Sequence, residues 1–188
     1  LQEAIDTYRT SFQRYWQQML LEKLGLQNKE ADDSELITEL FELLRLRETD
    51  MTIFFRGLAQ LGADADDADL VPEQLDEALY EAVKEQDSYF QMRAAWLDRY
   101  RRRLTRNSWS AAERRTVMNR ANPRYVFRNY LAQQAIDRVE QGDFSLVDEL
   151  LDVLRHPYDE QPDKAAFAQK RPEWARNRPG CSMLSCSS

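Results

Sequence analysis

The sequence has few glycines, and they do not form a cluster. The five are Gly25, Gly57, Gly62, Gly142 and Gly180. A loop that holds phosphate needs closely spaced glycines, because several backbone amides must approach the anion together. We therefore expect no nucleotide site of the usual kind, and no bound cofactor, within these 188 residues.

Histidine and cysteine are also scarce. The one histidine is His156, and the two cysteines, Cys181 and Cys186, both lie in the last eight residues. A zinc site needs three or four converging ligands, and two terminal cysteines cannot staple a chain of this length. We therefore predict no metal site, no disulfide scaffold and no catalytic residue. His156 is interpreted as a helix C-terminal residue, favoured by the helix dipole.

Long apolar runs are missing as well. No stretch of 18 apolar residues is present, and the N-terminus lacks the features of a secretory signal. We therefore expect no membrane contact and a reducing compartment: the cytoplasm in a bacterium, or a mitochondrion in a eukaryote. The first residue is leucine rather than methionine, which suggests a fragment of a longer protein.

Apolar residues recur at helical spacing through most of the chain. The pattern predicts an all-α fold, a bundle-like domain over residues 1–156, followed by an extended C-terminal tail over residues 157–188 that holds four of the six prolines. One stripe of the first helix is predicted to be buried. Its members are Ile5, Tyr8, Phe12, Tyr15 and Met19.

Local motifs mark several helix starts. Asp32 with Glu35, and Ser110 with Glu113, have the spacing of capping boxes. Asn122 and Pro123 are interpreted as a cap and a first-turn proline that open a helix ended by Gly142. Because that segment is apolar over most of its circumference, we predict that it is the most buried element.

The charges are unevenly distributed. Residues 30–85 contain 17 acidic and 4 basic side chains, a net of −13, whereas residues 99–128 contain 10 arginines and one acid, a net of +9. The simplest interpretation is that the two segments face each other, or another domain. An alternative is that the arginines between 99 and 106 bind phosphates. Helical periodicity favours placing them on the outer face of a helix whose inner face holds Trp96, Tyr100 and Leu104. The chain is also acidic overall, so we expect no nucleic-acid partner.

The cysteines are the sharpest local feature. A thiol on the third residue from a chain end, such as that of Cys186, is expected to be mobile, exposed and able to reach a partner sulfur. An inert leftover thiol is the alternative interpretation. Cys181 and Cys186 are therefore our candidate redox residues.

Two stretches resemble a known family. Residues 113–136 read ERRTVMNRANPRYVFRNYLAQQAI, and the chain ends in SCSS after the segment PEWA at 172–175. Both resemble the C-terminal part of the SelO (YdiU, selenoprotein O) family of pseudokinase protein adenylyltransferases. His156, Pro157 and Tyr158, between a helix and the tail, also fit this resemblance.

The resemblance implies more than the residues do. Family members have a protein-kinase-like fold, bind ATP with magnesium or manganese, and transfer AMP to hydroxyl side chains of proteins; some are described as transferring UMP. Their nucleotide-binding and metal-binding residues lie in the N-terminal portion, which has no counterpart here. Cys186 matches the position that is selenocysteine in some members, so the resemblance implies a redox role, and Cys181 could pair with it.

Three hypotheses follow. The chain is the C-terminal helical region of an adenylyltransferase, inactive alone, whose partners are its own N-terminal kinase-like domain and the protein substrates. Alternatively it is a helical protein-interaction module that uses its acidic and basic faces. A third hypothesis is nucleic-acid binding through the arginines. An isolated chain is also expected to self-associate if an apolar patch has lost its cover.

Overall fold

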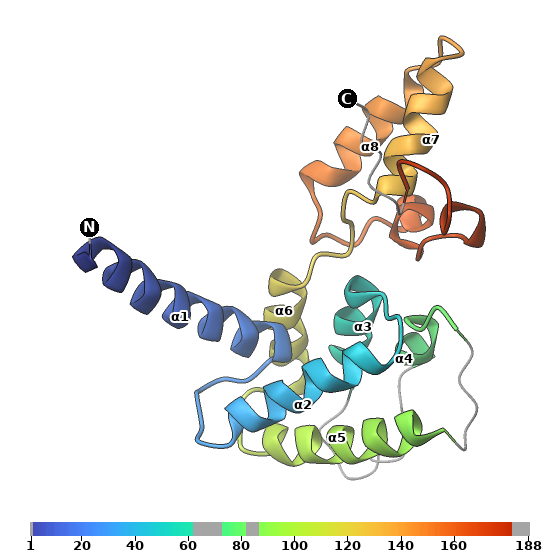
Figure 1. Ribbon diagram of the computed structural model, residues 1–188. Coiled ribbons are helices and arrows are strands. Elements are labelled where there is room, and N and C mark those ends of the chain that lie inside the picture. Colours follow the sequence, from blue (N-terminus) through green and yellow to red (C-terminus); the bar gives the residue numbers. More distant parts are fainter. Residues whose placement is uncertain (1, 62–72, 82–86, 182–188) are drawn as a thin grey trace. The chain divides into compact units, whose positions relative to one another are not determined.

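The computed structural model describes residues 2–61, 73–81 and 87–181, and these residues are helical wherever they are regular (Figure 1). Thr49 and Leu79 form an isolated bridge, and no β-strand longer than one bridge residue occurs in these ranges. The prediction of an all-α fold is therefore confirmed. The elements are α1 (Gln2–Leu24), α2 (Asp33–Leu46), α3 (Met51–Leu58), α4 (Glu73–Glu77), α5 (Ser88–Leu104), α6 (Ala111–Ala121), α7 (Asn129–Val139), α8 (Ser145–Arg155), η2 (Pro162–Ala168) and η3 (Glu173–Ala175).

The chain divides into two compact units, Leu1–Asn122 and Pro123–Ser188. This division differs from the boundary at residues 156 and 157 that the proline content suggested. The tail contains two short helices, η2 and η3. It belongs to the second unit since Ala175 and Cys181 share a buried apolar cluster with residues of α7 and α8. Two helices cannot bury their own apolar faces, and the tail supplies the missing cover.

The first unit has its core between α2, α3, α5, α6 and the end of α1. Trp96 and Tyr100 of α5 stack at 5.1 Å in the middle of it. Their polar atoms are satisfied by main-chain carbonyls: the Trp96 indole donates to Leu36 at 2.9 Å, and the Tyr100 hydroxyl donates to Leu24 at 2.6 Å. Buried aromatic residues normally find such partners. The predicted inner face of this helix is confirmed.

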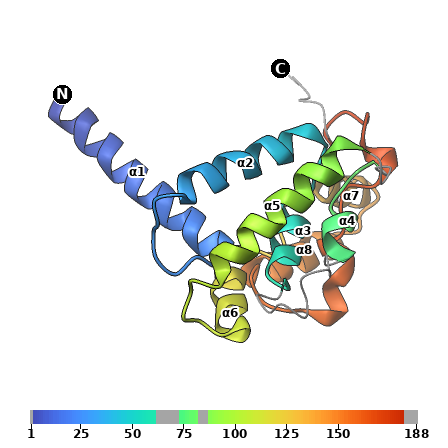
Figure 2. The same ribbon diagram turned by 90° about the horizontal axis from the view of Figure 1, so that it is seen from below.

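The apolar stripe of α1 is exposed, so the prediction that it is buried was wrong. Ile5, Tyr8, Phe12, Tyr15 and Met19 are between 37% and 68% exposed. Both views show the first half of α1 standing clear of the other helices of its unit (Figure 1, Figure 2). Only its last turns are buried, through three leucines on another face of the helix. Those leucines are Leu20, Leu21 and Leu24.

The capping motifs had different outcomes. Ser110 and Glu113 form the predicted capping box at the start of α6, each accepting a hydrogen bond from the other's backbone amide. Asp32 makes no side-chain cap on α2, so that prediction was wrong. Its carboxylate instead accepts a hydrogen bond from Arg106 at 2.9 Å, and the charged partner takes precedence over the local cap.

The segment after Asn122 also differs from its prediction. Asn122 closes α6 rather than opening the next helix, and its side-chain amide donates to the carbonyls of Lys23 and Met118 at 2.9 Å each. Helix α7 begins only at Asn129. Phe127 is 63% exposed, so this segment is not the most buried element. An apolar circumference predicts burial only if the fold supplies neighbours on every side.

Candidate functional site

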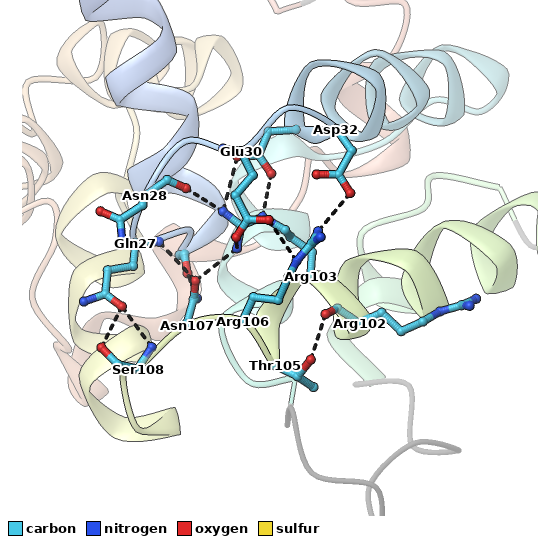
Figure 3. Close-up of polar contacts among 12 residues, drawn as sticks. Gln27, Asn28, Glu30, Asp32, Arg102, Arg103, Thr105, Arg106, Asn107 and Ser108 are labelled. Atoms are coloured by element: carbon cyan, nitrogen blue, oxygen red, sulfur yellow. Dashed lines mark hydrogen bonds and ion pairs between the residues drawn. The ribbon is translucent and has the colours of Figure 1, made fainter.

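A buried ion pair joins two helices of the first unit. Arg103 of α5 and Asp33 of α2 have side chains that are 2% and 1% exposed. The Arg103 Nε lies 2.6 Å from Oδ1 of Asp33, and Nη2 lies 3.2 Å from Oδ2, so the pair is bidentate. The same guanidinium also contacts the carbonyl of Asn28 at 2.5 Å, Oδ1 of Asn107 at 3.2 Å and Oε1 of Glu30 at 3.2 Å (Figure 3). Every nitrogen of the guanidinium is therefore engaged, as a buried charge requires.

Other arginines of α5 and the turn after it extend this contact toward solvent. Arg106 lies 3.0 Å from Glu30 and 2.9 Å from Asp32 (Figure 3). The hydrogen bond from Arg106 holds the pKa of Asp32 below its ordinary value of 3.8. Arg99 bridges Glu35, at 3.1 Å, and Glu39 on α2. Within the first unit, the acids between residues 30 and 39 therefore face the arginines between residues 99 and 106. For these parts of the two segments, the simpler of the two sequence interpretations is confirmed.

The burial of Arg103 corrects the prediction that the whole arginine run lies on the outer face of its helix. The sequence nevertheless contained a signal for the burial of Arg103. On α5, Tyr100 follows Trp96 after four residues and Arg103 follows Tyr100 after three. On α2, Asp33 begins a row of buried residues with the same spacing of three and four, which continues through Leu36, Leu40 and Leu43. A charged residue in register with a buried stripe indicates a buried ion pair when a second helix offers the opposite charge at the matching place.

The turn after α5 is tied to the turn after α1. The Asn107 side-chain amide donates to the carbonyl of Gly25 at 2.8 Å, and Ser108 donates to Oε1 of Gln27 through both its amide and its hydroxyl at 2.9 Å (Figure 3). Gly25 has a φ of 63°, and a Cβ there would lie 2.6 Å from Cγ of Arg114. The last turn of α1 is therefore held tightly, although its first turns are not.

A second buried arginine, Arg114 of α6, lies beside Tyr100. It donates to the carbonyl of Leu61 and approaches the Tyr100 hydroxyl at 3.4 Å and the sulfur of Met118 at 3.1 Å. Burial raises the pKa of Tyr100 to about 12, so its phenol stays protonated near neutrality. This cluster joins α5, α6 and the turn after α3, and it offers packing and hydrogen bonding rather than an activated nucleophile.

Of the two candidate redox residues, the structure describes only Cys181. Cys181 is a free thiol that lies buried in the apolar cluster of the second unit with Tyr130, Leu131 and Leu150. Cys186 lies outside the described residues. Cys181 follows Gly180, whose φ is 81°. The reasoning from an exposed terminal thiol therefore does not extend to Cys181, which is packed like a small apolar side chain.

The second unit also contains an open groove of about 600 Å³ between α7, α8 and the tail. Tyr130, Leu146 and Trp174 line its apolar part, and Asp137 and Glu149 line its polar part. Sequence reasoning missed this groove, because it depends on how the tail folds back across the two helices.

His156 caps the end of α8, where its Nδ1 lies 3.5 Å from Asp159 on the surface. Across residues 2–61, 73–81 and 87–181, no three His, Cys, Asp or Glu side chains come together as metal ligands. Within those same ranges, no helix combines the length and apolar character that a membrane crossing needs.

Comparison with known proteins identifies the family. The model of the family described as "Protein adenylyltransferase SelO" matches residues 1–155. Proteins named "Protein nucleotidyltransferase YdiU" match the whole chain: 50% identity to that of Rhodopirellula baltica, 49% to that of Aromatoleum aromaticum and 46% to that of Tolumonas auensis. The chain spans 37%, 35% and 35% of these relatives. It therefore belongs to the SelO family, of which it represents the C-terminal region.

Proposed function

We propose that this chain is the C-terminal helical region of a protein adenylyltransferase, which transfers AMP from ATP to serine, threonine or tyrosine hydroxyls of other proteins. The match of residues 1–155 to the adenylyltransferase family carries this proposal. ATP and its magnesium or manganese ion bind in the region that precedes the chain in the full-length protein. The bacterial relatives support a cytoplasmic location.

In this proposal the helical region supports the catalytic region and contains no catalytic residue of its own. The ion pairs between α2 and α5 fit a supporting role, because they fix the first unit internally. They also weaken the alternative of an interaction module that uses its acidic and basic faces. Charges that are already paired have little left to offer a protein or nucleic-acid partner.

The tail cysteines add a redox element. Cys186 is the principal candidate, and a disulfide between it and Cys181 requires the buried Cys181 thiol to become accessible first. An external disulfide, such as oxidised glutathione, would accept the two electrons. In this proposal, the disulfide restrains the conformation of the tail, and the restrained tail then affects the catalytic region.

The experiment compares label transfer from radiolabelled ATP to protein by the full-length protein and by this chain, each with magnesium or manganese. Transfer by the full-length protein alone is expected, and transfer by this chain would overturn the division of roles. Cys186→Ser in the full-length protein is expected to abolish any effect of a reductant on the rate. The matched control is Ser185→Ala, which should leave that effect unchanged.

A further inference from the structure

The exposed stripe of α1 is the largest feature that the proposed function leaves unexplained. Six large apolar side chains lie along the free part of one helix, each at least 37% exposed. They are Ile5, Tyr8, Phe12, Tyr15, Trp16 and Met19. Single exposed apolar residues are ordinary, but a continuous row of this kind marks a surface that another body covers.

The aromatic rings of the stripe are already ordered against one another. Tyr8 and Phe12 stack at 6.1 Å, Phe12 and Trp16 at 6.0 Å, and Trp16 stacks on Phe41 of α2 at 6.4 Å. This ladder connects the free half of α1 to the body of the first unit. A surface with fixed side chains loses little conformational entropy when a partner binds, which favours docking.

Apart from Trp16, which reaches Phe41 of α2, the stripe is distinct from the leucine face by which α1 packs on its own unit. From Ile5 to Met19 the spacing alternates between three and four residues, and continuing it leads to the polar Glu22 and Lys23. The buried leucines, Leu20 among them, lie on another face. Helix α1 thus has two apolar faces, of which the first unit uses one. A helix that stands alone over several turns is marginally stable in water, so the second face also needs a partner.

We propose that this stripe is the docking surface for the region that precedes the chain in the full-length protein. The relatives devote about two thirds of their length to that region, since the chain spans only 35–37% of them. Helix α1 begins at Gln2, so the N-terminal side of the described chain lies at the free end of this helix (Figure 1). Covalent attachment at that end gives it a high effective concentration at the stripe. The inference rests on the place of the chain in the longer protein and is independent of the adenylyl transfer.

Hydrogen exchange tests the proposal in the full-length protein and in this chain. Amides of residues 2–19 should exchange at least about tenfold more slowly in the full-length protein, because docking prevents local opening of α1. Equal rates in the two proteins would overturn the proposal. Slow exchange already in this chain would overturn it as well, since the occupant would then be the second unit or a second copy. Repeating the measurement at several protein concentrations separates those two.

A pair of variants locates the surface. Tyr8→Ser with Phe12→Ser removes two exposed rings that stack on each other in the stripe. In the full-length protein it should abolish the protection of α1, while the urea midpoint of this chain stays unchanged. The control, Thr10→Ser with Gln13→Ser, changes exposed residues outside the stripe and should keep the protection. Protection that survives the first variant contradicts the proposal. Hydrogen exchange tests the docking surface, whereas label transfer tests the proposed function. A full-length protein that protects α1 but transfers no adenylyl group would therefore contradict only the proposed function.

Discussion

Arg103 and Asp33, 70 residues apart in the sequence, form a bidentate ion pair that is almost completely buried. The pair fixes the start of α2 against the end of α5. Around it, Arg99 and Arg106 bind the acids that flank Asp33 on the surface. One buried ion pair and several exposed ones therefore connect the same two helices.

Replacing Arg103 by alanine should destabilise the first unit strongly. Asp33 would keep a buried charge without its main partner, and breaking such a pair costs about 3–5 kcal/mol. The measurement is the free energy of unfolding in urea. Arg102→Ala is the matched control, because Arg102 pairs with Asp98 on the surface and such pairs contribute about 0–1 kcal/mol. Equal losses for the two variants would contradict a special role for the buried pair.

The chain should lose stability in acid. Hydrogen bonds hold the pKa of Asp32, Asp87 and Glu113 below their ordinary values of 3.8, 3.8 and 4.5. A carboxylate whose pKa is lowered by folding stabilises the folded state above its ordinary value, and this contribution disappears as the pH falls through the folded pKa. The urea midpoint should therefore be constant from about pH 7 to 5 and fall below about pH 4. Asp32→Asn should reduce that fall, and an acid response that ignores the substitution would exclude Asp32 as a contributor.

Alanine should be tolerated differently at two glycines that both have a positive φ. At Gly142, with a φ of 84° and nothing within 4 Å of the position that a Cβ would take, only the left-handed backbone is unfavourable, at about 1–2 kcal/mol. At Gly25 the added Cβ also meets Arg114 and Met118 at under 3 Å, and such overpacking costs about 1–3 kcal/mol more. Denaturation of the two variants measures the difference. A smaller loss for Gly25→Ala than for Gly142→Ala would mean that α1 can shift away from α6.

The thiol of Cys181 should be protected from alkylation in the native chain. It is buried among apolar side chains, so a maleimide can react only when the end of the second unit opens. The test uses Cys186→Ser, which leaves Cys181 as the only thiol, and follows the added mass with time. Labelling should be slow without denaturant and fast in urea. Fast labelling under native conditions would instead support direct oxidation of Cys181.

Much of the fold could be predicted from local patterns. The helical spacing indicated the all-α class, the pair Ser110 and Glu113 indicated a helix start, and Trp96 with Tyr100 indicated the inner face of α5. The opposite charges of residues 30–85 and 99–128 indicated that the two segments meet. The first three features depend only on residues that are close in the sequence, and the last depends only on net charge. Neither kind of feature requires knowledge of the tertiary packing.

By itself, the sequence determined which elements are helices, which residues share a face, and the resemblance to the SelO family. The tertiary structure decided which of those faces are covered. It exposed the stripe around Phe12, buried Arg103 with Asp33, and folded the tail over α7 and α8 so that Cys181 became a core residue. The physical reason is that periodicity describes one helix at a time, whereas burial depends on the neighbours that long-range packing brings to each face.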